Sequence, residues 1–597
     1  MKKIVSLALA SAMVLGLLAA CGGTTTETTP TPAPVESQAT VETPAPADGP
    51  FNLNINIASE PQTIDPALNS AVDGAIMTGH MFEGLYRWAD SGELVDGVQD
   101  CDLAELVPGQ SDGEPEKVVN EDGTVTYTFK IRSDAKWSDG KPVTAGDFVY
   151  SWRRLATPAT AADYCYMIDM VKGYAEVNGG IPETDANGKV VLDEEGNPVI
   201  KEYADPTTLG VEAPDDSTFV VTLTYDCPYF LEVCAFPATF PVREDVVSAD
   251  PDGWTHNVET YLSNGAYTLT QWDHNSQIIM AKNEYYYDVD ALGPDTLTFK
   301  LMDDNNAMLT GFNSGELDFI EDMPVDEIPA LLTSGDLRIV PYIGTYYVCY
   351  NVEKAPFDDP KVRQAFTLAI DAQYIVENVT QTGQVPASGF VPSGVAGVGP
   401  DFRAEGGDYW TPATTEEQYA ENVKKAQELL AEAGYPNGEG FPTVTYLYNT
   451  SDNHKKIGEA LQQQWQTALG VEVKLENQEW AAFLETRKNG EYQIARNGWI
   501  ADYNDPISFL DMWLTGGGNN DAQYSNPDYD AAINEAKSTA DPEARMAAMH
   551  RAEDIIMGQD WALGPIYFYT QKYMLNSDVK GMYYTPLGYF FFDRCTK

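Results

Sequence analysis

Basic residues are scarce in this chain. Its 597 residues include 91 Asp and Glu but only 36 Lys and Arg, so the formal net charge at pH 7 is −55. A chain this acidic has no large basic face for the phosphates of a nucleic acid. The composition therefore excludes nucleic-acid binding. An anionic ligand would require a local group of Arg, Lys or helix N-termini.

Metal-binding motifs are also missing. No Cys-x-x-Cys occurs, and the five histidines show no zinc spacing. We therefore predict neither a metal site nor another cofactor. Six cysteines follow Cys21 and either form disulfides or remain free, and the sequence does not decide between these states. They are Cys101, Cys165, Cys227, Cys234, Cys349 and Cys595.

The chain lacks a convincing catalytic motif. The run from Gly109 to Gly113 matches Gly-x-Ser-x-Gly, but it lies among Pro and Gly residues and not between a strand and a helix. Asp502 and Asp505 imitate a glycosidase pair, yet their spacing in one loop says nothing about the distance between their carboxyl groups. An extracellular hydrolase is thus the weaker alternative, and we predict that the protein is not an enzyme.

An export signal opens the sequence. Met1-Lys2-Lys3 precedes an apolar run from Ile4 to Ala20, which is marginally short for a membrane span. Leu18-Ala-Ala-Cys21 then resembles the cleavage box of bacterial lipoproteins, in which the cysteine receives lipid. We predict a signal peptide at 1–20 and lipidation of Cys21, which place the protein on the outer face of the cytoplasmic membrane. The alternative is an uncleaved transmembrane anchor.

Residues 21–50 are predicted to form a linker. From Gly22 to Pro50 there are eight Thr and six Pro, and no Phe, Trp, Tyr, Leu or Ile. Such a segment cannot bury a core and serves as a tether.

The rest of the chain has alternating strand and helix patterns. Phe51 to Ile57 alternates apolar residues with Asn, which is typical of a half-buried strand, and Thr144-Ala-Gly-Asp147 resembles a capping box that begins a helix. From Thr443 onward, strands and helices alternate, which predicts a mostly parallel sheet. The expected units are a surface hairpin at 178–206, helix 416–433, strand 443–448, helix 453–469, strand 471–475, helix 480–488 and strand 491–499.

The stretch from Tyr492 to Leu510 is the strongest candidate for a binding site. Gly498 interrupts its apolar residues, and Asp505-Pro506 is typical of a helix start. Asp502 is therefore expected in a strand-to-helix loop, where ligands usually bind in α/β domains. A carboxylate there can hold an amine. The alternative is that Asp502 and Asp505 are only turn or capping residues.

Several further runs carry a resemblance to one family, in order from about residue 51 to 597. They are Glu60-Pro-Gln-Thr-Ile-Asp-Pro66, Phe82-Glu-Gly-Leu85, Ala135-Lys-Trp-Ser-Asp-Gly-Lys-Pro-Val-Thr144 with Asp147-Phe-Val-Tyr-Ser-Trp152, Asn264-Gly-Ala-Tyr267 and Leu429-Leu-Ala-Glu-Ala-Gly-Tyr435. Together with the stretch around Asp502, they resemble the oligopeptide-binding proteins that serve ABC importers. These are lipoproteins of family 5 of the extracellular solute-binding proteins.

The resemblance implies an α/β, two-lobed hinged fold of the periplasmic-binding-protein type with a third, extra domain. Lobe one would comprise residues 51–82, 244–343 and 571–597, the extra domain 83–243, and lobe two 344–570. Such a monomer would capture oligopeptides between closing lobes and deliver them to permease subunits in the membrane. The alternatives are a peptide-sensing receptor, or a binder of dipeptides, nickel chelates or sugars.

The same resemblance implies roles for individual residues. Asp502 would pair with the peptide α-amino group, and Arg496, Arg487 and His454 would receive its carboxylate. Thr380 stands where the family can have a lysine, and Gly344 and Ile500 stand where some relatives have a disulfide. The backbone that pairs with the peptide would come from Arg496, Asn497, Gly498, Trp499 and Ile500 and from Ala71 and Val72, and the pocket walls from Tyr164, Tyr347, Trp480 and Tyr569.

Overall fold

A computed structural model describes residues 50–95, 97–184, 189–191, 199–399 and 401–597. The predicted signal peptide, Cys21 and nearly all of the predicted linker lie outside these residues. No helix within the described ranges is long and apolar enough to cross a membrane.

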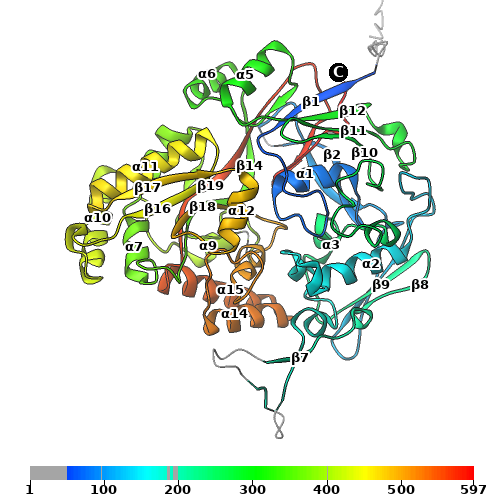
Figure 1. Ribbon diagram of the computed structural model, residues 1–597, viewed down its shortest axis with the longest axis horizontal. Helices are drawn as coiled ribbons and strands as arrows, with labels where there is room; N and C mark the ends of the chain where they lie inside the picture. Colours follow the sequence, from blue (N-terminus) through cyan, green and yellow to red (C-terminus); the bar gives the residue numbers. More distant parts are fainter. Residues whose placement is uncertain (1–49, 96, 185–188, 192–198, 400) are drawn as a thin grey trace, which may run out of the picture. The chain divides into compact units, whose positions relative to one another are not determined.

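Eleven strands of the described chain form one mixed sheet (Figure 1). Strand β16 pairs in parallel with β17 and β18, as the alternating pattern predicts, but β14 pairs in antiparallel orientation with both β18 and β19. The prediction of a mostly parallel sheet is therefore wrong for the sheet as a whole. In sheet order the strands are β10 (Tyr267–Asp273), β11 (Gln277–Lys282), β12 (Thr296–Leu301), β1 (Asn52–Ile57), β13 (Phe319–Ile320), β19 (Leu563–Leu575), β14 (Arg338–Tyr350), β18 (Ile494–Ile500), β16 (Val444–Asn449) and β17 (Val473–Gln478), with β15 (Val385–Pro386) beside β19.

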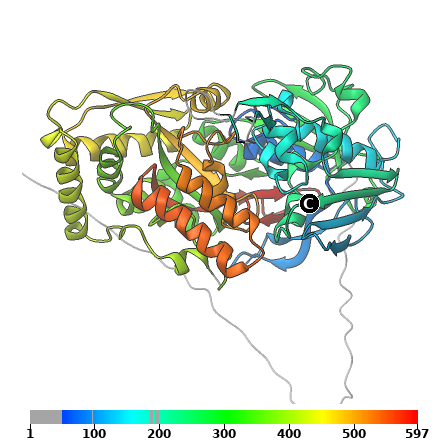
Figure 2. The ribbon, with the colours of Figure 1, turned by 90° about the horizontal axis from the view of Figure 1, so that it is seen from below.

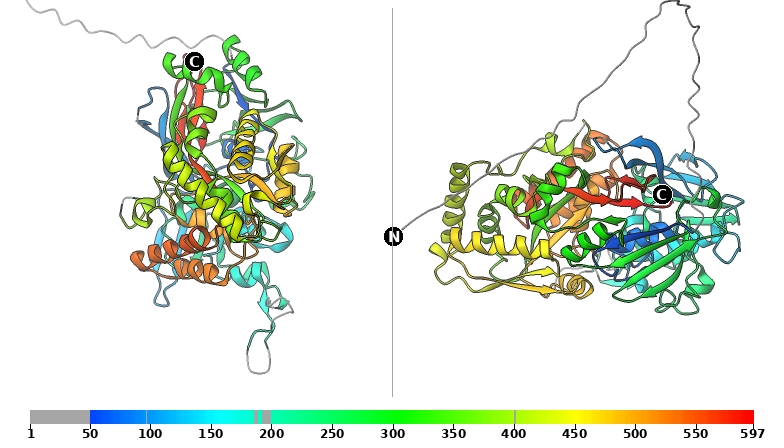
Figure 3. Two further views of the ribbon diagram at one scale, coloured as in Figure 1. Left: turned by 90° about the vertical axis from the view of Figure 1, so that its left-hand side faces the viewer. Right: turned by 90° about the horizontal axis from the view of Figure 1, so that it is seen from above.

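The long strands β14 and β19 connect the two parts of this sheet. Each has 13 residues, and β19 runs from the strands around β16 toward those around β1 (red in Figure 3). Their pairing is irregular at two places, between Pro341 and Thr345 and between Tyr346 and Tyr347. Within the first of these, Gly344 lies opposite Ile500 of β18. These are the two positions at which some relatives would have a disulfide.

Strand β1 is half-buried over its first residues, as predicted, since Asn52 is exposed and Asn54 partly exposed, but its last residues are buried on both faces. Leu53, Ile55 and Ile57 are buried as the alternation predicts, but Asn56 is also buried. Its amide nitrogen donates to the carbonyl oxygens of Ile57, Lys300 and Met302. The amide is satisfied in the interior because β1 lies between β12 and β13.

The predicted helices form close to their expected bounds. Helix α2 (Ala145–Ala156) begins with the predicted capping box, in which the Thr144 and Asp147 side chains cap each other's backbone. In α11, Ile457, Leu461 and Trp465 lie on one buried face, which is the reason for the helical spacing. The helices of this part of the chain are α10 (Glu416–Glu432), α11 (Asp452–Leu469) and α12 (Trp480–Lys488).

Smaller sheets and further helices surround the main sheet (Figures 1 and 2). The predicted hairpin is confirmed by the antiparallel pair β6 (Ile181–Pro182) and β7 (Ile200–Glu202), which projects at the bottom of Figure 1. The other strands are β2 (Tyr86–Leu94), β3 (Asp102–Pro108), β4 (Glu116–Val119), β5 (Val125–Lys130), β8 (Val211–Asp215), β9 (Thr218–Leu223), β20 (Tyr583–Thr585) and β21 (Tyr589–Phe591). The other helices are α1 (Val72–Met81), α3 (Phe230–Val233), α4 (Glu244–Val247), α5 (Asn305–Ser314), α6 (Ile328–Ser334), α7 (Pro360–Leu368), α8 (Ala372–Tyr374), α9 (Phe402–Gly406), α13 (Ile507–Leu510), α14 (Pro527–Ser538) and α15 (Pro542–Glu553).

Two of the family-like runs interlock. The backbone N–H of Glu83 donates to the Asn264 side chain at 3.1 Å, and the Asn264 amide donates to the Glu83 carbonyl at 2.8 Å. Gly265 passes so close that an added Cβ would lie 2.7 Å from the backbone of Met81 and Phe82. These runs therefore hold α1 against the strands that follow residue 264.

All six cysteines after Cys21 are free. Five are buried and Cys165 is partly exposed. The alternatives that the sequence left open are therefore resolved in favour of thiols.

Candidate functional site

A cavity of about 390 Å³ lies among segments that are far apart in the sequence. Its walls come from the start of α1, from β18 and the loop after it, from α12, and from β19. This volume is typical of sites for small ligands. Twelve predicted residues line it: Ala71, Val72, Tyr164, Trp480, Arg487, Arg496, Asn497, Gly498, Trp499, Ile500, Asp502 and Tyr569.

Tyr347 and His454 do not line the cavity. The Tyr347 ring is fully buried in β14 and makes edge contacts with Phe390 and Trp513. It is thus part of the packed core behind the site. His454, in the first turn of α11, lies beside Tyr346, whose hydroxyl is 3.2 Å from the imidazole Nδ1.

Asp502 is a buried carboxylate without a cation. It lies in the loop between β18 and α13, as predicted, and is 7% exposed. Oδ1 accepts a hydrogen bond from the Tyr164 hydroxyl at 3.0 Å, and Oδ2 accepts one from the Ser508 hydroxyl at 3.2 Å. No Lys, Arg or His of the described residues forms an ion pair with it. Burial raises the pKa of Asp502 well above its ordinary value, although the hydrogen bond from Tyr164 opposes this rise.

Asp505 has the same burial but a different environment. It is also 7% exposed, yet Arg545 of α15 holds both of its oxygens, at 2.7 and 2.8 Å. Its Oδ1 also accepts from the backbone N–H of Ile507 at the start of α13. The capping interpretation therefore describes Asp505, while Asp502 is left free to receive a positively charged ligand group.

The edge of β18 is open where it borders the cavity. On one side, all of β18 pairs with β14, from Ile494 to Ile500. On the other side, β16 pairs only with Ile494 and Ala495. The backbone from Arg496 to Ile500, roughly 13 Å of extended strand, therefore has one edge without a strand partner. Such an edge can accept an extended chain as an added strand.

Gly498 lies at the middle of this open edge. Its N–H donates to the side chain of its neighbour Asn497, at 2.8 Å. An added Cβ at this position would lie 2.4 Å from the Tyr569 hydroxyl. Glycine thus keeps the strand backbone accessible and makes room for the tyrosine that lines the cavity.

Arg496 is a cation without a carboxylate partner among the described residues. Its guanidinium lies 5.3 Å from the centre of the Tyr346 ring, and its Nε has no hydrogen-bond partner. By contrast, the predicted ligand residue Arg487 already pairs with Asp521 at 2.7 Å. Asn497 donates to the same Asp521 oxygen at 3.0 Å. Of the two arginines, Arg496 is therefore the one available to an anionic ligand group.

His454 is neutral in this arrangement. Burial, together with the positive charges of Arg496 and Lys572, holds its pKa well below the ordinary value. It therefore adds no charge for a ligand carboxylate, and its contact with Tyr346 places it behind Arg496.

The sequence analysis missed most of the charged residues of the cavity wall, and three of these lie together. Lys572 and Asp322 pair at 2.7 Å, and Glu321 lies beside them. Burial, and then the charge of Asp322, raise the pKa of Glu321 to about 7. No local pattern marks these residues, because they meet only where β13 and β19 pair.

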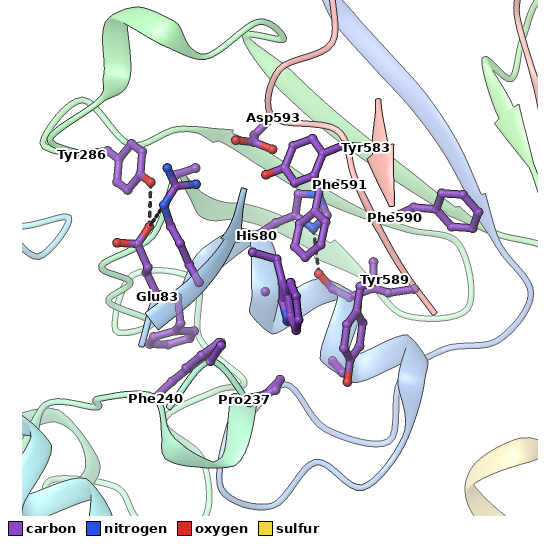
Figure 4. A pocket seen from close by; sticks show the side chains of 18 residues that line it. His80, Glu83, Pro237, Phe240, Tyr286, Tyr583, Tyr589, Phe590, Phe591 and Asp593 are labelled. Atoms are coloured by element: carbon purple, nitrogen blue, oxygen red, sulfur yellow. Dashed lines mark hydrogen bonds and ion pairs between the residues drawn. The ribbon is translucent and has the colours of Figure 1, made fainter. Parts of the chain in front are cut away.

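A second, smaller cavity of about 50 Å³ adjoins the first across Ala75, Ile76 and Tyr589 (Figure 4). Its polar wall contains Glu83, which accepts a hydrogen bond from the Tyr286 hydroxyl at 2.7 Å, as Figure 4 shows. The space suffices for a few water molecules. In the described part of the chain, no group of three or more His, Cys, Asp or Glu residues is placed to hold a metal ion.

Known proteins share this architecture. The family model of bacterial extracellular solute-binding proteins, family 5 (middle), matches residues 109–521. The chain is 34% identical over 543 residues to the dipeptide-binding protein DppE of Bacillus subtilis (strain 168), covering 90% of each chain. It is 35% identical over 529 residues to the periplasmic oligopeptide-binding protein OppA of Salmonella typhimurium, covering 88% of each chain.

The fold agrees with a solved structure as well. The crystal structure of Haemophilus influenzae OppA in complex with RPPGFSPFR superposes with a TM-score of 0.79 at 31% sequence identity, covering 92% of this chain and 99% of that one. This match confirms the predicted two-lobed α/β fold. The chain therefore belongs to family 5 of the bacterial extracellular solute-binding proteins.

Proposed function

We propose that this solute-binding protein captures oligopeptides in the larger cavity and delivers them to an ABC import permease. The observation that carries the proposal is the buried carboxylate of Asp502, which has no cation at the end of a strand whose edge is open. A peptide of variable sequence has a constant amine and a constant backbone. The amine matches Asp502, and the backbone matches the edge from Arg496 to Ile500.

The other end of the peptide has a weaker but consistent match. Its carboxylate would meet Arg496, the one cation of the cavity wall that has no carboxylate partner among the described residues. The names of the relatives support the same ligand class, since they are dipeptide- and oligopeptide-binding proteins and one was solved with a nine-residue peptide. Ala71 and Val72, on the wall formed by α1, would contact the peptide from the opposite lobe.

Calorimetry with one peptide in three forms tests this function. N-acetylation removes the charge that pairs with Asp502, so it should cost about 3–5 kcal/mol of binding free energy. C-amidation removes a charge that is shared among several groups and water, so it should cost about 0.5–2 kcal/mol. The reverse order, or indifference to both changes, would reject peptide binding in this orientation.

We also propose that the two lobes close on the ligand, with residues 343–344 and 570–571 as the crossing points between them. This boundary coincides with the irregular pairing of β14 and β19. Contacts already link the facing segments, such as Lys488 with Asp163 at 2.5 Å and Gln62 with Glu485 at 2.8 Å. Small-angle scattering should show a smaller radius of gyration when peptide is added, and an unchanged radius at saturation would reject closure.

The proposed location follows from the N-terminal sequence. We propose that Cys21 is lipidated and anchors a monomeric protein outside the cytoplasmic membrane, where its permease lies. Leu18-Ala-Ala-Cys21 after an apolar run supports this. Mass spectrometry of the native protein should find lipid on Cys21 as the first residue, and Cys21→Ala should abolish it. A native protein that begins at another, unmodified residue would reject the anchor.

A further inference from the structure

Most charges of the larger cavity are paired with each other. Lys488 pairs with Asp163, Arg487 with Asp521 and Lys572 with Asp322, at 2.5 to 2.7 Å. Among the described residues of its wall, the acids without an ion pair are Asp73, Glu321, Glu485 and Asp502, whereas the only such base is Arg496. The cavity therefore has spare negative charge beyond the carboxylate assigned to the peptide amine.

Asp73 is the acid whose environment is most incomplete. It is the second residue of α1, and its Oδ1 accepts a hydrogen bond from the N–H of Gly74 at 2.8 Å. Its Oδ2 is buried and has no hydrogen-bond partner. Burial raises the pKa of Asp73 to about 6, although the hydrogen bond from Gly74 and the nearby Trp480 indole oppose the rise. An unpartnered oxygen in such a place costs free energy until a donor reaches it.

Trp480 faces Asp73 from the first turn of α12. Its indole Nε1 lies close enough to affect Asp73, yet it makes no hydrogen bond of normal geometry and is itself buried without a partner. Its ring stacks on Phe483, with centroids 6.0 Å apart. A carboxylate and an aromatic wall thus come together from α1 and α12, two elements that both line the cavity.

This pair selects for a positive charge. An ammonium or guanidinium group can form a charge-assisted hydrogen bond with Asp73 and also lie against the indole ring. A neutral side chain supplies no counter-charge, and an acidic one would be repelled. A purely capping role does not explain the site, because the cap uses only Oδ1 and leaves Oδ2 inside the cavity wall.

We propose that Asp73 and Trp480 form a subsite for a lysine or arginine side chain, so that the protein prefers basic peptides. The inference rests on the proposed peptide-binding function, and it adds a specificity-determining residue to it. The proposed contacts of the peptide amine with Asp502 and of the peptide backbone with β18 need neither Asp73 nor a basic side chain. The subsite can therefore be rejected while peptide binding stands.

Tripeptides in which lysine replaces norleucine at one position test the subsite, because the two side chains are similar in length and differ in charge. Lys-Ala-Ala, Ala-Lys-Ala and Ala-Ala-Lys would each be compared with the matching norleucine peptide by calorimetry. At one position, lysine should bind at least about tenfold more tightly than norleucine. Asp73→Asn, which keeps an oxygen for the Gly74 cap, should reduce this ratio to about threefold or less.

Asp528→Asn is the matched control. Asp528 is likewise the second residue of a helix, α14, but it is exposed and does not line the cavity. The Asp528→Asn variant should leave the ratio of lysine-peptide to norleucine-peptide affinity unchanged. Equal binding of lysine and norleucine at all three positions, or an unchanged ratio in Asp73→Asn, would overturn the subsite while leaving peptide binding intact. Failure of every tripeptide and of the nine-residue peptide RPPGFSPFR to bind would overturn the peptide-binding function itself, and the subsite with it.

Discussion

The two ends of the cavity hold their charges in different ways. At one end stands Asp502, a single carboxylate that has two hydroxyl donors and no cation. At the other end, Arg496 shares its surroundings with Lys572, Asp322 and Glu321 and with a group of tyrosine rings. Charge recognition is concentrated in one group at the first end and distributed over several groups at the second.

This difference decides how each end responds to change. Where one buried group carries the recognition, its loss leaves the ligand charge unpaired, and the cost is large. Where several groups share it, the remaining ones and water compensate in part. The same reasoning separates Asp502 from Asp505, since both are equally buried but only Asp505 has its cation, Arg545, inside the protein.

Asp502→Asn is expected to have the largest effect on binding. The peptide amine would lose its counter-ion in a buried site, so the binding free energy should weaken by about 3–5 kcal/mol. Folding should not suffer. The pKa of Asp502 is raised in the folded protein, so its contribution to folding stability is fully present below its ordinary pKa. That contribution is lost as pH rises through the raised value. The variant should therefore melt at or above the wild-type temperature at pH 7.

Asp505→Asn is the matched control for this variant. It leaves Arg545 without its partner in a buried place, so it should cost about 3–5 kcal/mol of folding free energy. Chemical denaturation of both variants and calorimetry on the folded fraction separate the two effects. A destabilised Asp502→Asn protein with normal peptide affinity would contradict the assignment of Asp502 to the ligand.

The distributed end should respond to pH through Glu321. Its pKa of about 7 means that it is neutral at pH 6 and ionised at pH 8, where it opposes a ligand carboxylate beside Arg496 and Lys572. The affinity advantage of a free-acid peptide over its amide should therefore shrink by about 1 kcal/mol between these pH values. Comparing the two forms of one peptide cancels the titration of its amine.

Glu321→Gln should remove this pH dependence. As for Asp502, the raised pKa makes the stability of the folded protein depend on pH. The contribution of Glu321 to the free energy of unfolding is fully present below about pH 4.5 and is lost as pH rises through about 7. The variant should therefore gain stability relative to wild type across that range. A free-acid advantage that stays constant from pH 6 to pH 8 in the wild type would show that Glu321 does not face the ligand carboxylate.

Local patterns predicted much of the fold. The bounds of α10, α11 and α12 follow from helical spacing and terminal glycines, and the start of α2 follows from the capping box of Thr144 and Asp147. Those patterns could not predict that β14 pairs antiparallel with β18 and β19 in the main sheet. Its strands come from outside the alternating segment and pair with partners far away in sequence.

The binding site likewise has features that local patterns predict and features that depend on distant contacts. The loop position of Asp502 could be predicted because the strand before it and the helix after it leave local signals. The occupation of Arg487 by Asp521 could not, and neither could the exposure of Asp73 to the cavity, because each depends on contacts between distant segments. Residue patterns alone also left open whether Asp502 and Asp505 are both only turn or capping residues, and the position of Arg545 on α15 shows that Asp505 has its cation inside the protein.

His454 should have the smallest effect of the residues assigned to the ligand. It is neutral, lies behind Arg496, and contacts Tyr346 with its Nδ1, so His454→Ala removes one neutral hydrogen bond and some support for the arginine. Peptide affinity should fall by about 0.5–1 kcal/mol. The loss should be the same at pH 6 and pH 8, because the depressed pKa keeps the imidazole uncharged at both. Calorimetry at the two pH values, with Asp502→Asn as the reference for a large loss, measures both quantities. A loss as large as that of Asp502→Asn, or a loss confined to pH 6, would mean that a charged His454 binds the peptide carboxylate directly. Charge recognition at the Arg496 end would then be concentrated in one group, as it is at the Asp502 end.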